Sequence, residues 1–194
     1  MLRRLLAVVV VVAVLAVAWV GVRGYLAVRH LDDAAATWSQ AQDELVAVDV
    51  TAATESVQLI QDDTSAARDL TSDPVWNLVG RFPWGGQNLR ATATGAAVGD
   101  DLARDALPAA LVAATAVGGI EAGLRSGDLN ASAEGATTLS EALVSLQSAR
   151  DDARADLAAV DRRYLAPQVR TVLDDVEASL DRTDQIGAGL ADAQ

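Results

Sequence analysis

The hydrophobic pattern of the chain begins with an unbroken apolar run. Arg3 and Arg4 precede residues 5–22, which contain no charged or strongly polar side chain. As a helix that rises about 1.5 Å per residue, this run spans about 27 Å, close to the roughly 30 Å hydrocarbon core of a bilayer. Trp19 and Tyr25 lie near its far end, where aromatic rings favour the headgroup region. The pattern therefore predicts that residues 1–30 form a membrane anchor.

The anchor prediction has a stated set of lipid-facing residues and one alternative. The residues expected to contact lipid are Leu5, Leu6, Leu15, Trp19, Val22 and Tyr25. Arginines before the run favour a cytoplasmic N-terminus, which leaves the bulk of the chain extracytoplasmic. The alternative is a cleaved signal peptide, because Ala16-Val17-Ala18 fits the small-x-small cleavage pattern. The apolar run continues past that point to Val22, which favours an uncleaved anchor.

Beyond the anchor, apolar positions recur with helical spacing. One stripe repeats every seven residues: Leu31, Trp38, Leu45, Ala52, Leu59 and Ala66. A second follows spacings of three and four: Val46, Val50, Ala53, Val57, Ile60, Thr64 and Ala67. Together they predict one long amphipathic helix over residues 27–71 that continues the membrane helix.

Ser72-Asp73-Pro74 is expected to end this helix, because a residue before proline avoids helical angles. Asp73 can cap a short helix over residues 75–81 with Pro74 at its first position. Pro83 and Gly85-Gly86 then predict a turn, so residues 72–88 form a corner with a short helix. Gln87 or Asn88 opens the next helix.

Three more helices are expected after this corner. The first covers residues 89–125, and Pro108 should kink or break it. Gly127 and Asp128 mark a junction, because glycine ends helices and aspartate begins them. The seam of the third helix is Leu139, Leu143, Leu146, Arg150, Ala153, Leu157, Val160 and Tyr164, which has coiled-coil spacing. The fourth helix, after Pro167, presents Val169, Leu173, Val176, Leu180, Thr183, Gly187 and Leu190.

No segment shows the sustained alternation of a strand, so the predicted fold class is all-α. We expect a single N-terminal transmembrane helix that continues into an elongated antiparallel bundle of about four helices. Residues 31–194 would form one alanine-rich extracytoplasmic domain. The heptad stripes are equally compatible with burial inside the bundle and with homo-oligomer formation.

The negative charge of the chain makes polyanionic partners unfavourable. The net charge is −12, and all 27 acidic residues lie beyond position 31. Such a domain should be repelled by nucleic acid and by anionic lipid, so we expect no nucleic-acid partner. Cysteine is absent, so stability must come from burial without disulfides.

Catalytic chemistry has few candidates. His30, the single histidine, lies beside the anchor without a recognisable motif, and we interpret it as an interfacial polar residue. Five acidic pairs are candidates for binding divalent cations: Asp32-Asp33, Asp62-Asp63, Asp100-Asp101, Asp151-Asp152 and Asp174-Asp175. Adjacent helix residues point about 100° apart, so we interpret the pairs as solvated polar faces. We therefore predict that the chain is not an enzyme and that it binds no cofactor or metal ion.

The predicted corner holds Trp76, Phe82 and Trp84, three of the five aromatic residues outside the anchor. One reading is a partner contact, since tryptophan is enriched at binding hot spots. The other reading is packing, in which the rings cover the end of a bundle whose alanine core is thin. The sequence leaves both open and favours packing.

The same corner carries a family resemblance. Pro74-Val75-Trp76-Asn77-Leu78, followed by Phe82-Pro83-Trp84-Gly85-Gly86 and Leu89, resembles the N-terminal region of actinobacterial membrane-anchored proteins grouped as domain of unknown function 4012. The resemblance implies an anchor, alanine-rich helices and a place in the actinobacterial cell envelope. In that family a mixed domain follows the helices, and this chain ends at Gln194 before such a segment. The resemblance therefore transfers no catalytic residue.

These patterns predict a membrane-anchored, non-catalytic accessory or structural subunit of an envelope or membrane complex. Its partners would be membrane lipid, through residues 5–22, and another membrane or envelope protein. One alternative is an extracytoplasmic sensor or ligand-binding module. Another is the non-catalytic part of a polysaccharide-linked envelope enzyme.

Overall fold

The N-terminal apolar run opens a 45-residue helix, α1 (Leu2–Val46). It is followed by α2 (Val50–Thr71), α3 (Pro74–Val79), α4 (Gly86–Asp101), a π-helical turn (Leu102–Ala106), α5 (Leu107–Ser126) and α6 (Leu129–Ala158). The computed structural model describes residues 2–180 except 48, 83, 84, 168, 175 and 179, and of residues 2–9, 45 and 46 it describes the backbone alone. That part of the chain contains no strand, so the all-α prediction is confirmed.

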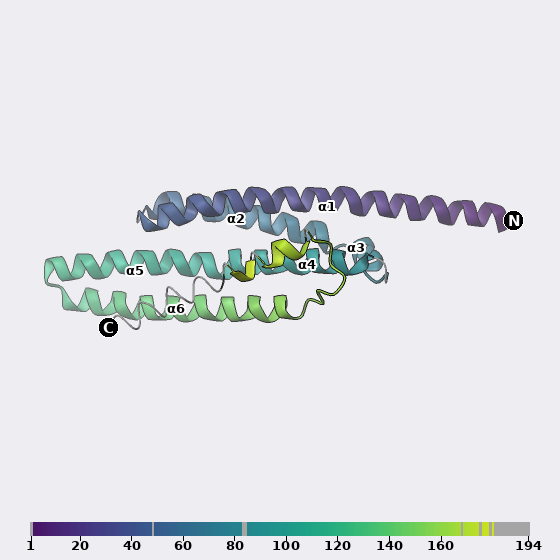
Figure 1. Ribbon diagram of the computed structural model, residues 1–194. Coiled ribbons are helices and arrows are strands. Elements are labelled where there is room, and N and C mark those ends of the chain that lie inside the picture. The colour runs from purple at the N-terminus through teal and green to yellow at the C-terminus, as the bar shows by residue number, and fades with distance from the viewer. Residues whose placement is uncertain are drawn as a thin grey trace.

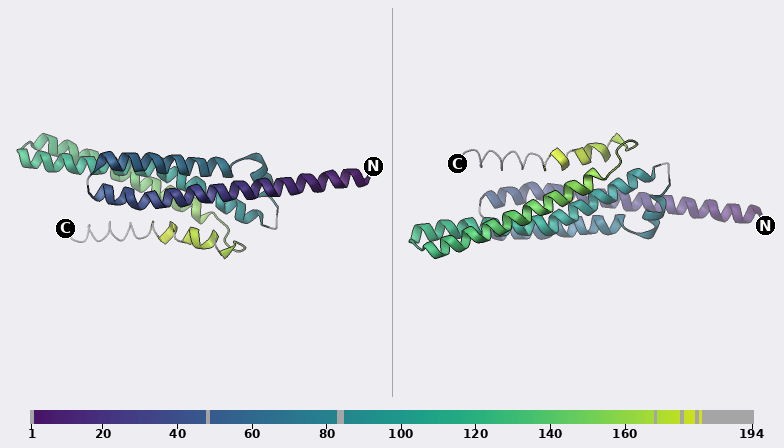
Figure 2. Two further views of the ribbon diagram at one scale, coloured as in Figure 1. Left: turned by 90° about the horizontal axis from the view of Figure 1, so that it is seen from above. Right: turned by 90° about the horizontal axis from the view of Figure 1, so that it is seen from below.

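The helices form an elongated molecule made of two long hairpins (Figure 1). α1 and α2 are antiparallel, and α2 packs against α4 and α5. α4, the π turn and α5 follow one another as a single rod, and α6 runs back along it. The N-terminal part of α1 projects from one end of the molecule, and the α5–α6 hairpin extends past the α1–α2 turn at the other end (Figure 2).

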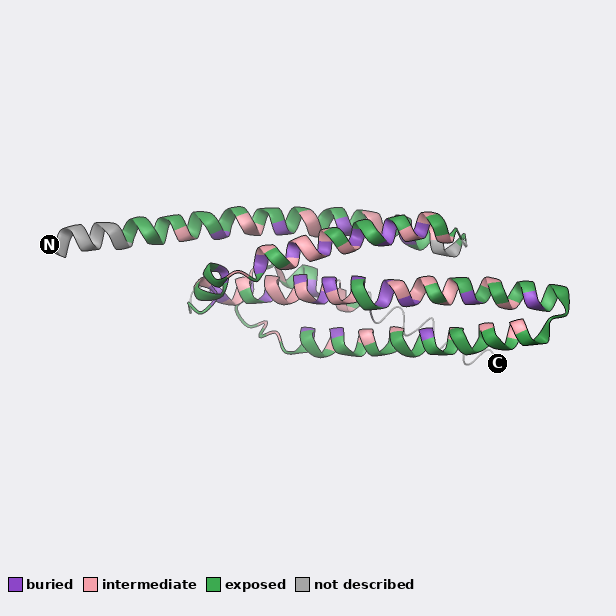
Figure 3. Cartoon of the chain, turned by 180° about the vertical axis from the view of Figure 1, so that it is seen from behind, coloured by how far each residue is buried: buried purple, intermediate pink, exposed green. Residues whose placement is uncertain are grey.

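The two helices of the first hairpin pack through small side chains. On α1 the buried positions lie seven residues apart: Val20, Ala27, Ala34 and Ala41. On α2 the buried residues are Ala53, Ser56, Val57, Ile60, Thr64, Ala67 and Thr71. Because an alanine seam lets helix axes approach closely, the two helices stay in contact along the length of α2. The three-four stripe predicted within residues 50–67 is this buried face, and Figure 3 shows buried positions recurring along the hairpin.

The prediction of one helix over residues 27–71 is wrong. The chain leaves the helix at Ala47 and re-enters it at Val50, with the Asp49 side chain accepting a hydrogen bond from the Ala52 N–H at 3.1 Å. No glycine or proline marks this turn. Folding back buries the three-four stripe of α2 against the alanine positions of α1, whereas a straight helix would leave both faces in water. Leu59, assigned to the seven-residue stripe, is 57 % exposed because that stripe was drawn through the turn.

Pro108 does not break the rod formed by α4, the π turn and α5. The π turn lies directly before it, and the Leu107 N–H bonds to the carbonyl of Leu102, five residues back. A proline within an α-helix clashes with the carbonyl four residues earlier. The wider π turn accommodates the ring, so α4 and α5 remain one rod.

The predicted junction at Gly127 and Asp128 is confirmed. Gly127 adopts a left-handed φ of 76°, and the Asp128 side chain accepts hydrogen bonds from the N–H groups of Asn130 and Ala131. The following helix ends at Ala158, so the seam predicted as far as Tyr164 is too long; Tyr164 is 76 % exposed outside the helix.

The chain after α6 crosses back over α4. The Ala166 N–H donates to Asn88 Oδ1 at 2.6 Å, and helical residues follow within 167–180. Their buried members, Leu173 and Leu180, share an apolar cluster with Leu157 of α6. The stripe positions Thr183, Gly187 and Leu190 lie outside the described residues.

Among the described residues, two helical stretches are long and apolar enough to cross a membrane, one within α1 and one within Gly86–Ser126. Signal sequences and core helices of soluble proteins also meet this criterion. The second stretch has only fifteen residues between the charges of Asp105 and Glu121, about 22 Å of helix and short of a bilayer core. α1 is therefore the better candidate for a span.

Candidate functional site

The corner between α2 and α4 is where the bundle meets the projecting part of α1. Asp73 caps α3, since its Oδ1 accepts hydrogen bonds from the N–H groups of Val75 at 2.7 Å and Trp76 at 3.0 Å. Pro74 occupies the first turn, where a missing N–H costs nothing. These details confirm the predicted start of the short helix, which ends at Val79.

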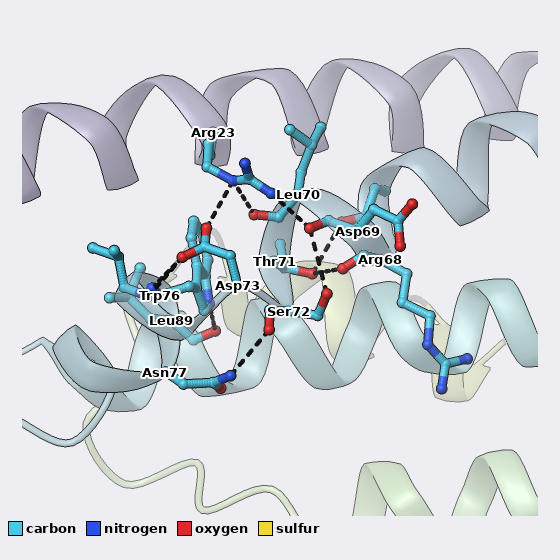
Figure 4. A network of polar contacts seen from close by, with 12 residues as sticks. Arg23, Arg68, Asp69, Leu70, Thr71, Ser72, Asp73, Trp76, Asn77 and Leu89 are labelled. Atoms are coloured by element: carbon cyan, nitrogen blue, oxygen red, sulfur yellow. Dashed lines mark hydrogen bonds and ion pairs between the residues drawn. The ribbon is translucent and has the colours of Figure 1, made fainter.

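Arg23 of α1 binds this corner from above (Figure 4). Its guanidinium donates to the carbonyl of Leu70 at 2.9 Å and to that of Asp69 at 2.7 Å, and its Nε lies 2.8 Å from Asp73 Oδ2. The two carbonyls belong to the last turn of α2, where a cation meets unpaired acceptors and the negative end of the helix dipole. One side chain of α1 thus caps α2 and pairs with the cap of α3. We call this set of contacts the Arg23 junction.

Trp76 packs directly beneath α1. Its side chain is 2 % exposed, and its Nε1–H donates to the carbonyl of Leu89 at 3.0 Å. A methyl group in place of the Gly24 hydrogen would lie 3.3 Å from the ring. The absence of a side chain at Gly24 therefore lets the indole lie against the backbone of α1.

Gly86 allows the chain to turn from α3 into α4. It is buried, and a Cβ there would lie 2.4 Å from the carbonyl oxygen of Gly80. The same carbonyl accepts a hydrogen bond from the Arg90 side chain. Gly85, just before, has a left-handed φ of 92°, which glycine adopts without strain.

We expect Gly86→Ala to lower the free energy of unfolding by about 1–3 kcal/mol, because the added methyl group meets backbone atoms that cannot rotate away. The matched control is Gly118→Ala, where a Cβ meets nothing within 4 Å and helix propensity improves. That control should gain about 0.5–1 kcal/mol. Urea unfolding of the full chain in detergent micelles measures both, and equal effects would contradict the packing at Gly86.

The structure places the predicted anchor residues on the projecting part of α1. Leu15 is 62 %, Trp19 52 %, Val22 60 % and Tyr25 63 % exposed. Leu5 and Leu6 belong to the same helix, but their side chains are outside the described set. Arg23 lies with its guanidinium carbon 5.5 Å from the centre of the Trp19 ring.

Two of the three aromatic residues predicted as a partner contact are described, and their environments differ. Trp76 is a packing residue and is not available to a partner. Phe82 is 60 % exposed, close to Leu78, which is 59 % exposed. Trp84 lies outside the described residues.

His30 has a partner that the sequence did not indicate. Its Nδ1 lies 2.8 Å from Oδ1 of Asp63 on α2, and its side chain is 38 % exposed. The contact joins the two helices of the first hairpin.

The acidic pair Asp100-Asp101 joins helices through ion pairs, so its interpretation as a solvated polar face is wrong. Asp100 is 1 % exposed, and its Oδ2 lies 2.9 Å from both Arg68 Nη1 and Arg104 Nη2. Asp101 takes a second contact from Arg68 at 2.5 Å. The hydrogen bond to Asp101, which is the larger cause, and the hydrogen bond to Asp100 raise the pKa of Arg68 above that of a free arginine. These side chains form an ion cluster that joins α2 to the α4–α5 rod.

Among the residues that the structure describes, no group of three or more histidine or acidic side chains is arranged to hold a metal ion. Asp175 of the last acidic pair is not among them. A shallow groove lies between α5 and α6, lined by Leu111, Val112, Thr115, Ala116, Gly135 and Thr138.

No family model, curated protein or solved structure matches this chain. The resemblance carried by residues 74–89 thus remains a hypothesis that rests on that motif.

Sequence reasoning missed the Arg23 junction. The sequence gives Arg23 no role beyond its place directly after the apolar run, inside the predicted anchor of residues 1–30. In the structure α1 continues through residue 30 without a break, and Val20 is the first buried residue among its described side chains, which begin at Val10. The available signal was the alanine seam, which begins before the charges of Asp32 and Asp33.

Proposed function

We propose that this chain is a single-pass membrane protein whose extracytoplasmic helices form a rigid stalk, a non-catalytic accessory or structural subunit of the cell envelope. In this proposal the N-terminus is cytoplasmic, and the helices beyond the membrane form an elongated antiparallel bundle of about four. The actinobacterial envelope is the setting that the corner motif suggests.

The observation that carries the proposal is that one unbroken helix is both the apolar projection and a core element of the bundle. Its projecting side chains Val10, Val11, Val12, Val14, Leu15, Val17 and Val22 are each 54–67 % exposed. A soluble protein rarely leaves such a continuous apolar surface in water, so lipid is the natural cover. Because α1 then packs from Val20 to Ala41, about 32 Å of helix couples the span to the bundle without a flexible linker.

The other end of the rod is the candidate contact surface. Gly86–Ser126 comprises 41 residues, which places the α5–α6 turn about 60 Å from the corner. Leu124 and Leu129 flank that turn and are 62 % and 73 % exposed. With the shallow groove, these residues give the distal hairpin an apolar surface of the kind that protein partners cover.

Membrane attachment and orientation are tested together in intact cells. The chain has no cysteine, so Leu129→Cys introduces a single thiol at the distal turn. We expect a membrane-impermeant maleimide to label it in intact cells, and the protein to stay with membranes after an alkaline wash. Its mass should include residues 1–18. A soluble product that begins at Trp19, or labelling only after lysis, would contradict the proposal.

The contact role is tested by a photoreactive amino acid at Leu124 or Leu129. We expect a discrete adduct with another envelope protein from these positions and none from exposed Gln58 on α2, the control. Adducts containing only a second copy of this chain would replace the accessory role with homo-oligomer formation. Absence of adducts from every position would exclude the distal hairpin as the contact.

A further inference from the structure

We propose that α3 and the residue that follows its turn, Phe82, rest on the lipid surface as a second membrane contact beside α1. The proposed contact, called here the α3 foot, consists of Val75, Leu78 and Phe82. This inference rests on the proposed membrane span of α1. It adds a lipid-binding surface to a part of the bundle that the span itself does not explain.

The three residues form one exposed apolar stripe. Val75 is 36 %, Leu78 59 % and Phe82 60 % exposed. Val75 and Leu78 lie three residues apart on α3 and so share one side of it. Phe82 follows the turn after α3, where its N–H donates to the carbonyl of Val79 at 3.1 Å. The buried Trp76 points the other way, under α1 and toward Leu89. Because Trp76 and Asp73 hold α3 in place, its apolar stripe is fixed on the outside of the bundle.

The α3 foot lies at the level where the apolar part of α1 ends. The charge-free run stops at Val22, and the next two residues, Arg23 and Gly24, are those that contact the corner. Two residues correspond to about 3 Å along a helix. Figures 1 and 2 place α3 at the end of the bundle from which the N-terminal part of α1 projects. If α1 spans the bilayer up to Val22, the foot lies at the headgroup region.

Charge at this end differs from charge elsewhere. Residues 74–99 contain two arginines and no acidic residue, although the whole chain carries −12. Residues 162–173 contain three arginines and no acidic residue, and the Ala166–Asn88 hydrogen bond brings them to the start of α4. Of the nearby acids, Asp73 pairs with Arg23, Asp161 with Arg163, and Asp174 and Glu177 both with Arg162, while Asp69 is exposed.

This distribution favours lipid over a protein partner as the cover of the foot. A basic residue close to the headgroups is attracted to anionic lipid and contributes about 1 kcal/mol. The contribution is smaller where an acid of the protein already pairs with the basic residue, as at Arg162 and Arg163. The acidic residues of the rest of the bundle are repelled by the same surface. The end of the bundle next to the span is therefore the end least repelled by an anionic bilayer. The span of α1 and the α3 foot together would fix the tilt of the stalk relative to the membrane.

The test uses single-cysteine variants of the full chain in nanodiscs of phosphatidylcholine and phosphatidylglycerol. Leu78→Cys and Phe82→Cys report on the foot, and Leu15→Cys reports on the span. Leu124→Cys, with similar exposure in the bundle, is the matched control. Each thiol carries a fluorophore, which is quenched either by nitroxide-labelled lipid or by aqueous iodide.

We expect lipid nitroxides to quench positions 78 and 82 several-fold more than position 124, and iodide to quench them less. If lipid nitroxides quench positions 78 and 82 no more than position 124, while they do quench position 15, the α3 foot is wrong and the span stands. Protection of 78 and 82 from both quenchers would show a protein cover and would also overturn it. Lack of lipid quenching at position 15 would remove the span, and the foot with it.

Discussion

Trp76→Ala is expected to lower the free energy of unfolding by about 3–5 kcal/mol, the range for removing a large buried aromatic side chain. The indole is 2 % exposed, lies against Gly24 and donates to the carbonyl of Leu89. Its loss opens a cavity beneath α1 and removes the side-chain hydrogen bond to that carbonyl. Denaturant unfolding of the full chain in mild detergent, followed by far-ultraviolet circular dichroism, measures the effect.

Leu78→Ala is the matched control for Trp76→Ala, because it truncates an apolar side chain on the same short helix. Leu78 is 59 % exposed, so its loss should cost about 0.5 kcal/mol or less. A Trp76 variant as stable as this control would mean that the corner does not hold α1 to the bundle. The coupling proposed between a membrane span and the bundle would then lack this contact.

Replacing both Arg68 and Arg104 with methionine is expected to cost about 3–5 kcal/mol, because it leaves the buried Asp100 carboxylate without a cation. The two guanidinium groups lie 2.9 Å from Asp100 Oδ2, which is the arrangement that makes the burial of this charge tolerable. The pKa of Arg68 is raised by hydrogen bonds to Asp101 and Asp100, so the arginine side of the cluster stays charged at every pH below the ordinary pKa of arginine. The measurement is again denaturant unfolding.

Two further variants separate the buried charge from general effects of losing arginine. Arg125→Met breaks an exposed pair with Glu121, 3.7 Å apart, and should cost about 0–1 kcal/mol. Adding Asp100→Asn to the double variant removes the buried charge and should recover part of the loss. A double variant no less stable than Arg125→Met would contradict the structural role of the cluster.

Local signals in the sequence were sufficient where a helix boundary depends on adjacent residues. Asp73 with Pro74 and Gly127 with Asp128 define boundaries through backbone angles and side-chain caps, and both are present as expected. The apolar stripe of α2 was also recognisable, since its spacing is that of a buried helix face. These features need no knowledge of distant parts of the chain.

Other boundaries depended on distant contacts and were predicted wrongly. The turn at residues 47–49 lacks glycine and proline, and it forms because two helix faces gain more by packing on each other than by continuing. The π turn before Pro108 likewise keeps α4 and α5 in one rod, where propensity alone predicted a kink or break. In both cases packing over many residues outweighs a local preference of a few kcal/mol.

The order of apolar and polar residues by itself determined that the protein is helical, where its N-terminal apolar helix lies and which residues cap its corners, because these depend on spacing and on neighbouring residues. Only the tertiary structure decided that Arg23 joins α1 to α2 and α3, that Trp76 is buried while Leu78 and Phe82 are exposed, and that Asp100 is surrounded by arginines. Those outcomes depend on which helix faces meet, and that choice is made by burial summed over the whole chain.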